Sequence, residues 1–267
     1  MNLFHTASGP LTTPDISLAR ALADIAAIDL DTARTPRPRS LPSIGVIISP
    51  QVIDATGGVI AVPPQRVWYT SYGSNMDLAR LAHYITGGQP PGSTREYPGC
   101  RDQRLPERSL PVEIVGSMYF ATESTVWTGG RAFLDPGAEG RVLARAHLVT
   151  AQQFSDIAAQ EMYREPGTDL DLSEVLSRGH AVLGNGRYET LVCPGILDGA
   201  PMLTFTAPWS VDEVELNAPS AAYLTVLTRG LLAAGAWEFA TIAEYVAACP
   251  GASGHWTERE IRNLIAA

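Results

Sequence analysis

The sequence predicts an α+β fold in which a curled mixed sheet or small β-barrel is flanked by helices. Short β-branched and aromatic runs follow one another between residues 112 and 207, and turn residues such as Asp135-Pro136-Gly137 separate them. Helical spacing of apolar residues is confined to a few segments between these runs. The 267 residues are 45% hydrophobic, which is enough for the core of one large domain or two modest ones.

The order of these patterns divides the chain into three parts. Residues 1–65 form an N-terminal extension with an amphipathic helix over 15–33, the proline-rich linker RTPRPRS, and two short strands in SIGVIISP and GGVIAVPP. Residues 66–235 form the main domain, and residues 236–267 form a C-terminal helical extension. The N-terminal helix could dock onto its own barrel or onto a second copy, so a homo-oligomer is one of two alternatives.

Within the main domain the expected elements alternate between strands and helices. A strand at Val67–Thr70 precedes a helix with Leu78, Leu81 and Ile85 on one face, and a polar loop follows. The Asp135-Pro136-Gly137 turn predicts a hairpin between two of the later strands. The remaining expected strands lie near 112–121, 131–135, 141–149, 187–193 and 201–207, and the remaining helices near 151–163, 219–234 and, in the C-terminal extension, 257–266.

Charge and composition narrow the range of partners. A net charge of −9 and a pI near 5.0 disfavour nucleic acid and favour a small molecule or another protein. We expect no membrane contact and a cytoplasmic location, because neither an export signal nor a long apolar run is evident. The three cysteines are far apart and lack metal-ligand spacing, so we expect neither a disulfide framework nor a metal site.

The first candidate site element is the junction Tyr72-Gly73-Ser74-Asn75 between the Val67 strand and the next helix. Ser74 or Asn75 could cap that helix, whose first amides then carry a partial positive charge. Gly73 leaves room for a ligand to approach the backbone. The junction therefore predicts a pocket for a carboxylate or an oxyanion, although an ordinary cap with a turn glycine is the alternative.

The second candidate element is Glu161. Thr150 and Gln153 have the spacing of a capping box for a helix that begins near 151. Its apolar stripe runs through Phe154 and Ile157, and Glu161 continues that stripe. A carboxylate on a core-facing position pairs, becomes protonated or lines a cavity, so Glu161 is either a general acid/base or half of a buried salt bridge.

Other polar residues carry weaker signals. His83 lies on the polar side of its helix and is expected to be solvated, and His147 and His180 have no metal-like neighbours in sequence. The loop arginines are expected to form a solvated surface, with recognition of an acidic substrate as the alternative; they are Arg95, Arg101, Arg104 and Arg108.

Four segments in this order resemble the γ-glutamylcyclotransferase-like superfamily, in particular its Tyr-Gly-Ser-Asn branch. They are Tyr72-Gly73-Ser74-Asn75-Met76, the STVWTGGRA segment with Trp127, the run VLARAHLVTAQQFSDIAAQE that ends at Glu161, and APSAAYLTVLTRGLLAAG with Pro219, Ser220 and Tyr223. The resemblance covers about residues 66–235. It implies a small mixed β-barrel with flanking helices and no metal or organic cofactor.

The resemblance also implies an activity and roles for residues. Enzymes of this superfamily release 5-oxoproline from γ-glutamyl amines by intramolecular aminolysis. Glu161 falls on the catalytic glutamate, and the substrate-binding positions fall on Tyr72, Gly73, Ser74, Asn75 and Met76. The late-strand tyrosine of some members is Phe205 or Thr206 here, so Tyr163 and Tyr188 are candidate substitutes. This departure keeps two alternatives open, a binding protein without turnover and an amide hydrolase in which Glu161 activates water.

Overall fold

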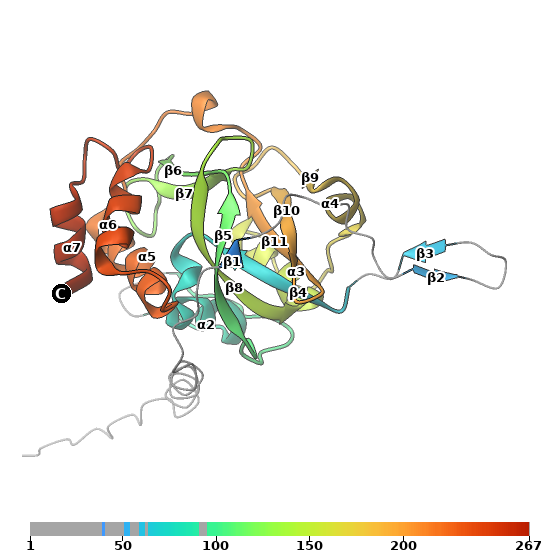
Figure 1. The fold of residues 1–267 in the computed structure, drawn as a ribbon. Coiled ribbons are helices and arrows are strands. Elements are labelled where there is room, and N and C mark those ends of the chain that lie inside the picture. Colours follow the sequence, from blue (N-terminus) through green and yellow to red (C-terminus); the bar gives the residue numbers. More distant parts are fainter. Residues whose placement is uncertain (1–38, 41–50, 54–58, 62–63, 91–94, 267) are drawn as a thin grey trace, which may run out of the picture.

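The computed structural model describes residues 39–40, 51–53, 59–61, 64–90 and 95–266. A curled seven-stranded sheet of order β1-β5-β8-β4-β11-β10-β9 forms its centre (Figure 1). The β1–β5 and β4–β11 pairs are parallel and the others antiparallel, so the α+β prediction with a mixed, curled sheet is confirmed. Among the described residues the edge strands β1 and β9 do not pair, so the sheet is open. Its strands are β1 (Arg39–Ser40), β4 (Arg66–Ser71), β5 (Ser109–Val115), β8 (Arg141–Thr150), β9 (His180–Val182), β10 (Thr190–Leu197) and β11 (Ala200–Thr206).

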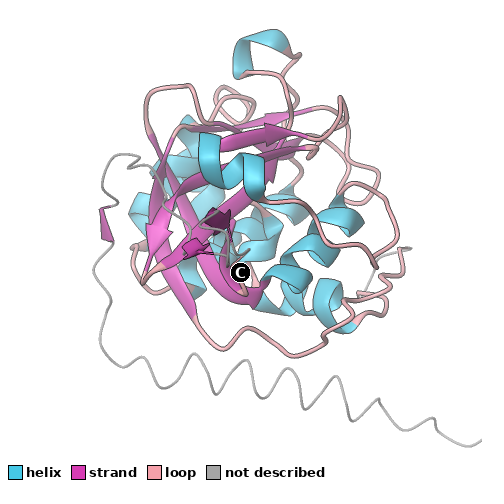
Figure 2. Cartoon of the chain, turned by 90° about the vertical axis from the view of Figure 1, so that its right-hand side faces the viewer, coloured by secondary structure: helices cyan, strands magenta, loops and turns pink. Residues whose placement is uncertain are grey.

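Helices flank this sheet on more than one side (Figure 2). Figure 1 shows α5, α6 and α7 together at one side, and α4 beside β9 at the opposite side. The sequence did not predict α4 or α6, because α4 is short and α6 follows a helix without a clear break in composition. The helices are α2 (Leu78–Thr86), α3 (Ala151–Glu161), α4 (Ser173–Arg178), α5 (Ala221–Ala233), α6 (Phe239–Ala248) and α7 (Glu258–Ala266), with single 3-10 turns η1 (Ser74–Met76) and η2 (Val211–Glu213).

The predicted hairpin between residues 131–135 and 141–149 is wrong. The strand β7 (Arg131–Asp135) pairs with β6 (Ser117–Ala121), whereas β8 pairs with β5 and β4. Gly116, with φ of 129°, divides the expected 112–121 strand into β5 and β6. A bent two-stranded ribbon results, and the Asp135-Pro136-Gly137 turn joins its two halves instead of reversing the chain. The expected strands near 187–193 and 201–207 correspond to β10 and β11, which form an antiparallel hairpin around Asp198-Gly199.

The strand β4 separates two hydrophobic clusters because both of its faces are buried. Trp68 belongs to the cluster that α5, α6 and α7 cover, and its neighbours Val67 and Tyr69 belong to the cluster that α2 and α3 cover. This alternation is the period of a pleated strand. The turn that follows β4 therefore lies between two packed layers, which fixes its position.

The N-terminal predictions fall largely outside the described residues. The helix expected over 15–33 and most of the linker belong to that part of the chain. The strand expected in SIGVIISP, residues 43–50, also lies outside them. The strand expected in GGVIAVPP contains β3 (Val59–Ala61), which pairs antiparallel with β2 (Gln51–Ile53). No helix in the described part of the chain is both long and apolar enough to cross a membrane.

Candidate functional site

The chain between β4 and α2 makes an extra turn before the helix begins. The amide of Met76 donates to the Gly73 carbonyl (3.1 Å), which closes the 3-10 turn η1. The N-cap of α2 is Asp77, whose side chain accepts from the Arg80 amide (3.0 Å). The prediction that Ser74 or Asn75 caps this helix is wrong, because η1 moves the helix start beyond them. Their side chains are consequently available for other contacts.

Glu161 is the last residue of α3, and the predicted capping box at Thr150 and Gln153 is present at the other end. Its carboxylate is half-buried and accepts a hydrogen bond from the side-chain nitrogen (Nδ2) of Asn75 (3.0 Å). The same nitrogen donates to the Tyr69 hydroxyl (3.1 Å). No arginine or lysine of the described chain lies within ion-pairing distance of Glu161.

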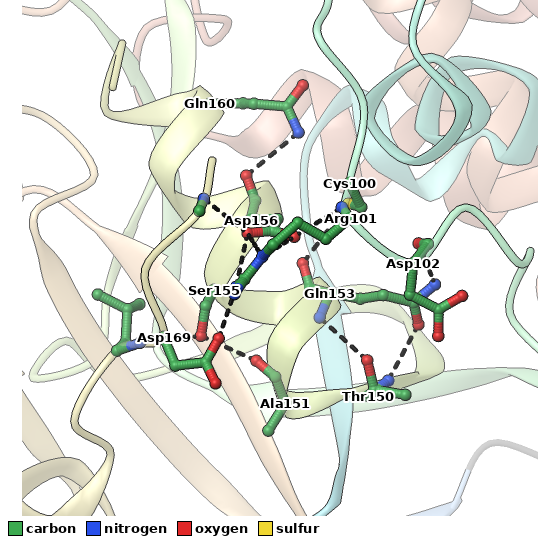
Figure 3. Close-up of polar contacts among 12 residues, drawn as sticks. Cys100, Arg101, Asp102, Thr150, Ala151, Gln153, Ser155, Asp156, Gln160 and Asp169 are labelled. Carbon is green, nitrogen blue, oxygen red and sulfur yellow. Dashed lines mark hydrogen bonds and ion pairs between the residues drawn. The ribbon is translucent and has the colours of Figure 1, made fainter. Parts of the chain in front are cut away.

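The buried salt bridge of α3 is formed by a different carboxylate, Asp156. Asp156 is fully buried, and its oxygens accept from the backbone amide (2.9 Å) and the Nε (3.0 Å) of Arg101 (Figure 3). Arg101 is exposed, as expected of a loop arginine, but its guanidinium also pairs with this buried carboxylate (2.9 Å), which the sequence did not predict.

One pocket joins Glu161 to the turn after β4. It encloses about 640 Å³, its open mouth included, and both Glu161 and the residues from Tyr72 to Asn75 line it. Its other walls come from Trp127, Tyr163, Tyr188 and Tyr223, with Phe205 of β11. The structure thus brings together the candidate residues from all four sequence segments.

Met76 does not line the pocket, in contrast to the other predicted substrate-binding residues. Its side chain is fully buried in the core with Trp68, and its amide is already bonded to Gly73. A ligand in the pocket therefore meets neither group. Tyr72, by contrast, lines the wall and donates its hydroxyl proton to the Phe205 carbonyl (2.9 Å).

A buried histidine holds the Asn75 backbone. The Nε2 atom of His147, on β8, lies 3.1 Å from the Asn75 carbonyl oxygen, and its Nδ1 lies 2.8 Å from the Ser109 hydroxyl. Burial, together with the nearby Arg145 charge, holds the pKa of His147 well below its usual range. The imidazole is therefore neutral, and because a carbonyl only accepts, Nε2 carries the proton. Its sequence position in a strand gave no sign of this role.

The loop after β6 and the start of α5 form the opposite wall. Ser220, the N-cap of α5, donates its hydroxyl proton to the Trp127 carbonyl (2.7 Å). Gly130 packs so closely on the Asn217 carbonyl that a side chain there would overlap it. These contacts hold the STVWTGG and Pro-Ser-x-x-Tyr segments against each other. The position of Tyr223 over the pocket follows from this packing.

The Tyr223 hydroxyl lies above Gly73. It accepts from the Ala132 amide (3.2 Å) and interacts with the Ser74 amide, and a Cβ on Gly73 would lie 3.1 Å from it. Burial raises the pKa of Tyr223 to about 12, so the hydroxyl remains protonated at neutral pH. Because the Ala132 amide donates to its oxygen, the hydroxyl can donate its own proton to an acceptor in the pocket.

Two further tyrosines occupy different depths of the pocket. Tyr188 donates to the Ala132 carbonyl (3.0 Å), and burial raises its pKa well above the usual value. Tyr163 is half-exposed beyond the end of α3. Partial burial opposes ionisation of Tyr163, but its hydrogen bond to Arg187 and the nearby guanidinium charges lower its pKa overall.

The sequence missed two buried arginines of this pocket, Arg80 and Arg131. Each is only 7% exposed and has a buried Nε without a hydrogen-bond partner. The expectation that the polar face of α2 is solvated is wrong, because His83 is buried there as well. In the described residues no group of three His, Cys, Asp or Glu side chains is arranged to hold a metal ion.

Comparisons with known proteins found one similar sequence and several solved structures with a similar fold. No family model matches the sequence. Over 189 residues the chain is 31% identical to histone deacetylase 5 of Arabidopsis thaliana, covering 63% of this chain but 28% of that protein, so it spans less than a third of the relative's length.

Among solved structures, similar folds include a gamma-glutamyl cyclotransferase, at 14% identity and a TM-score of 0.43 over 76% of this chain and 99% of that one. An uncharacterized protein from Homo sapiens matches at 15% identity and 0.41, over 76% of this chain and 99% of its own. YkqA from Bacillus subtilis matches at 18% identity and 0.32, over 62% of this chain and 48% of its own.

Proposed function

We propose that this protein is a cyclotransferase that releases 5-oxoproline from a γ-glutamyl amine or amide. The observation that carries the proposal is the Glu161 carboxylate, which lines a pocket opposite the Gly73–Ser74 backbone and has an amide, not a guanidinium, as its hydrogen-bond partner. A carboxylate held in this way can accept and return a proton.

The reaction requires little of the protein beyond positioning. The α-amine of the glutamyl group attacks its own γ-carbonyl, a five-membered ring closes, and the bond to the leaving nitrogen breaks. Because the nucleophile is tethered to its target, holding the bent conformer supplies much of the rate. Glu161 takes the proton that the α-ammonium loses and returns one to the departing nitrogen, so the products are 5-oxoproline and a free amine.

Donors at the turn after β4 suit the charge that develops on the carbonyl oxygen. The Ser74 hydroxyl and the Tyr223 hydroxyl are both close to Gly73, where the absence of a side chain lets the substrate reach the backbone. Asn75 holds Glu161 in place, and the neutral His147 holds Asn75. The Ser74 and Tyr223 hydroxyls are both proton donors at neutral pH, as a developing oxyanion requires.

Two alternative functions predict other outcomes for the same substrates. A protein that binds γ-glutamyl compounds without turnover would be stabilised by them and form nothing. An amide hydrolase that uses Glu161 to activate water would release free glutamate. Tyr223 provides a hydroxyl donor in the pocket although β11 has Phe205, and this favours the cyclotransferase over the binding protein.

The test is incubation with a panel of γ-glutamyl amino acids and amines, followed by mass spectrometry for 5-oxoproline and glutamate. We expect 5-oxoproline from the wild type and a loss of about 100-fold or more in kcat for Glu161→Gln, which keeps the Asn75 contact but cannot shuttle a proton. Glu165→Gln is the matched control, because Glu165 is exposed four residues further on. Turnover that survives Glu161→Gln would exclude this mechanism.

A further inference from the structure

Glu161 lies at the end of its helix, where a helix holds its residues least firmly. It is the last residue of α3, and the last turn of α3 contains no basic residue. Helix ends fray, and the partial negative charge of the helix dipole is concentrated at this end. Asn75 contacts the carboxylate itself. The backbone that carries Glu161 therefore needs a further support from outside α3.

Arg95, in the loop between α2 and β5, supplies that support. One of its terminal nitrogens donates to the carbonyl of Gln160 (2.6 Å), the residue before Glu161. The same carbonyl accepts from the Tyr163 amide (3.2 Å), a contact that closes the last turn. A guanidinium at the carbonyl end of a helix satisfies the terminal carbonyls and compensates their partial negative charge. The cation that α3 lacks in its own last turn thus comes from a segment 65 positions away.

Two tyrosine rings hold the Arg95 guanidinium. Its Cζ lies 4.6 Å from the ring centroid of Tyr97 and 4.5 Å from that of Tyr163. Tyr97 is fully buried and packs on Tyr84, with 4.5 Å between the ring centroids, so it is a fixed support. Contacts with ring faces stabilise a planar guanidinium and restrict its orientation. Arg95 therefore contacts the chain on both sides of Glu161.

The backbone after Glu161 is itself under constraint. Tyr163 has φ of 58°, a left-handed conformation that few bulky residues adopt, although its side chain is half-exposed. Such a conformation persists only where surrounding contacts fix it. Arg187, between β9 and β10, provides a second guanidinium, with its Cζ 4.7 Å from the Tyr163 centroid. The contacts of Arg95 and Arg187 with this ring hold the bend that ends α3.

We propose that Arg95 is a positioning residue, which fixes the last turn of α3 and thereby keeps the Glu161 carboxylate in place at the reacting atoms. This inference rests on the proposed function, because it concerns the acid/base of that reaction. Asn75 orients the carboxylate, and Arg95 fixes the backbone that carries it. Arg95 also lines the pocket, so direct binding of the substrate is the role that the test must separate from positioning.

Steady-state kinetics with γ-glutamyl-alanine separates the two roles. A displaced acid/base slows the chemical step, so Arg95→Gln should lower kcat by about 10- to 100-fold and change KM by less than about 2-fold. Arg95→Lys keeps the charge without the planar group, so it should recover part of kcat. Arg104→Gln, at an 80% exposed side chain in the same loop, is the control and should keep the wild-type values. A raised KM with unchanged kcat would overturn the inference and assign Arg95 to substrate binding.

Hydrogen exchange tests the same contact without any turnover. The Met162 and Arg164 amides donate to carbonyls of the last turns of α3. In Arg95→Gln these two amides should exchange about 10-fold faster, whereas the amide of Ile157, in the middle of α3, should keep its rate. Unchanged exchange at the end of α3, or an equal increase along the whole helix, would overturn the inference. So would faster local exchange that leaves kcat unchanged.

Two further outcomes complete the test. If Arg95→Gln does not fold, Tyr163→Leu takes its place, because it removes one of the two rings at a half-exposed position and should raise the same exchange rates. If the exchange rates respond as expected but the wild type forms no 5-oxoproline, the proposed reaction is refuted and the role of Arg95 in holding the end of α3 remains.

Discussion

At the scale of one residue, the site depends on the lack of a side chain at Gly73. Its φ of −114° is open to any residue, so conformation does not demand glycine. Space does, because a Cβ would lie 3.1 Å from the Tyr223 hydroxyl, which the Ala132 amide holds in place. The glycine therefore lets a hydroxyl from α5 approach the turn after β4, and with it the pocket floor.

This contact makes Gly73→Ala a test of the packing between the turn and α5. We expect it to lower the free energy of unfolding by about 1 kcal/mol through overpacking, and to lower kcat/KM by displacing Tyr223. In a Tyr223→Phe background the obstructing atom is gone, so the same substitution should cost less. Urea unfolding of the four proteins measures the coupling, and equal costs in both backgrounds would contradict the contact.

The acidic part of the site could be predicted from sequence and the basic part could not. Glu161 could be identified from the sequence because the cap and the apolar stripe that orient it belong to one helix. Arg80 and Arg131 look like ordinary surface residues in the sequence, because their hydrogen-bond partners, Tyr97 and the Glu123 carbonyl, lie in loops outside the helix and the strand that contain the arginines. The same applies to His147, whose role depends on Asn75, a residue 72 positions away.

His147 predicts a dependence of stability on pH. Its folded-state pKa is far below the value of about 6.5 expected in the unfolded chain, so below that pH the unfolded chain binds a proton that the folded chain does not. The contribution of His147 is thus fully present above about pH 6.5 and is lost on acidification, by up to about 1.4 kcal/mol per pH unit.

Denaturant unfolding at pH 7.5, 6.5 and 5.5 measures this loss. His147→Gln should flatten the slope, because glutamine can donate to the Asn75 carbonyl without titrating. His180→Gln, at an exposed histidine of β9, is the control and should keep the wild-type slope. An unchanged slope in His147→Gln would show that another group causes the acid sensitivity.

The helix α3 shows at the scale of an element how two carboxylates are given different environments. Asp156, in its middle, is enclosed and paired with Arg101 (Figure 3). Glu161, at its end, lines the pocket. Arg101 also reaches Asp169, so it ties the segment after α3 to the helix. The arginine-bearing loop thus anchors α3 at a point about one helical turn before Glu161.

Removing that anchor should be costly. Arg101→Gln leaves Asp156 buried without its counter-charge, and we expect a loss of about 3 kcal/mol in the free energy of unfolding, the lower end for a broken buried pair. Arg104→Gln is the matched control, since the Arg104 side chain is 80% exposed and should contribute about 0 to 1 kcal/mol. Thermal or denaturant unfolding measures both, and similar costs would contradict the burial of Asp156.

Element identities were predicted more reliably than pairings. The cap of α3 and the turn between β10 and β11 are set by adjacent residues, so sequence reveals them. The partner of β7 is set by the bend at Gly116, which carries β6 out of the main sheet. A local turn signal cannot report such a bend, and the hairpin prediction failed for that reason.

At the scale of the whole molecule, the C-terminal helices share the core of the main sheet. Ile242, Val246 and Ile261 are fully buried in the same cluster as Trp68 and Leu227. Backbone contacts reinforce this packing, because the Phe120 amide donates to the Pro250 carbonyl (2.8 Å) and the Trp256 indole donates to the Pro219 carbonyl (2.9 Å). The second contact reaches the residue before the cap of α5, and so connects residues 236–267 to the wall of the pocket.

This arrangement predicts that damage between α6 and α7 unfolds the whole protein. Gly251 has φ of 88° and lies against the Phe120 carbonyl, which a Cβ would overlap, whereas Gly254 has φ of 81° and open space. Both Gly→Ala substitutions carry the left-handed strain of about 1–2 kcal/mol, so their difference isolates the contact with β6. We expect Gly251→Ala to be less stable than Gly254→Ala and to keep a single cooperative transition in calorimetry. If residues 236–267 were instead an independent appendage, Gly251→Ala would create an early, separate transition and leave the main one in place.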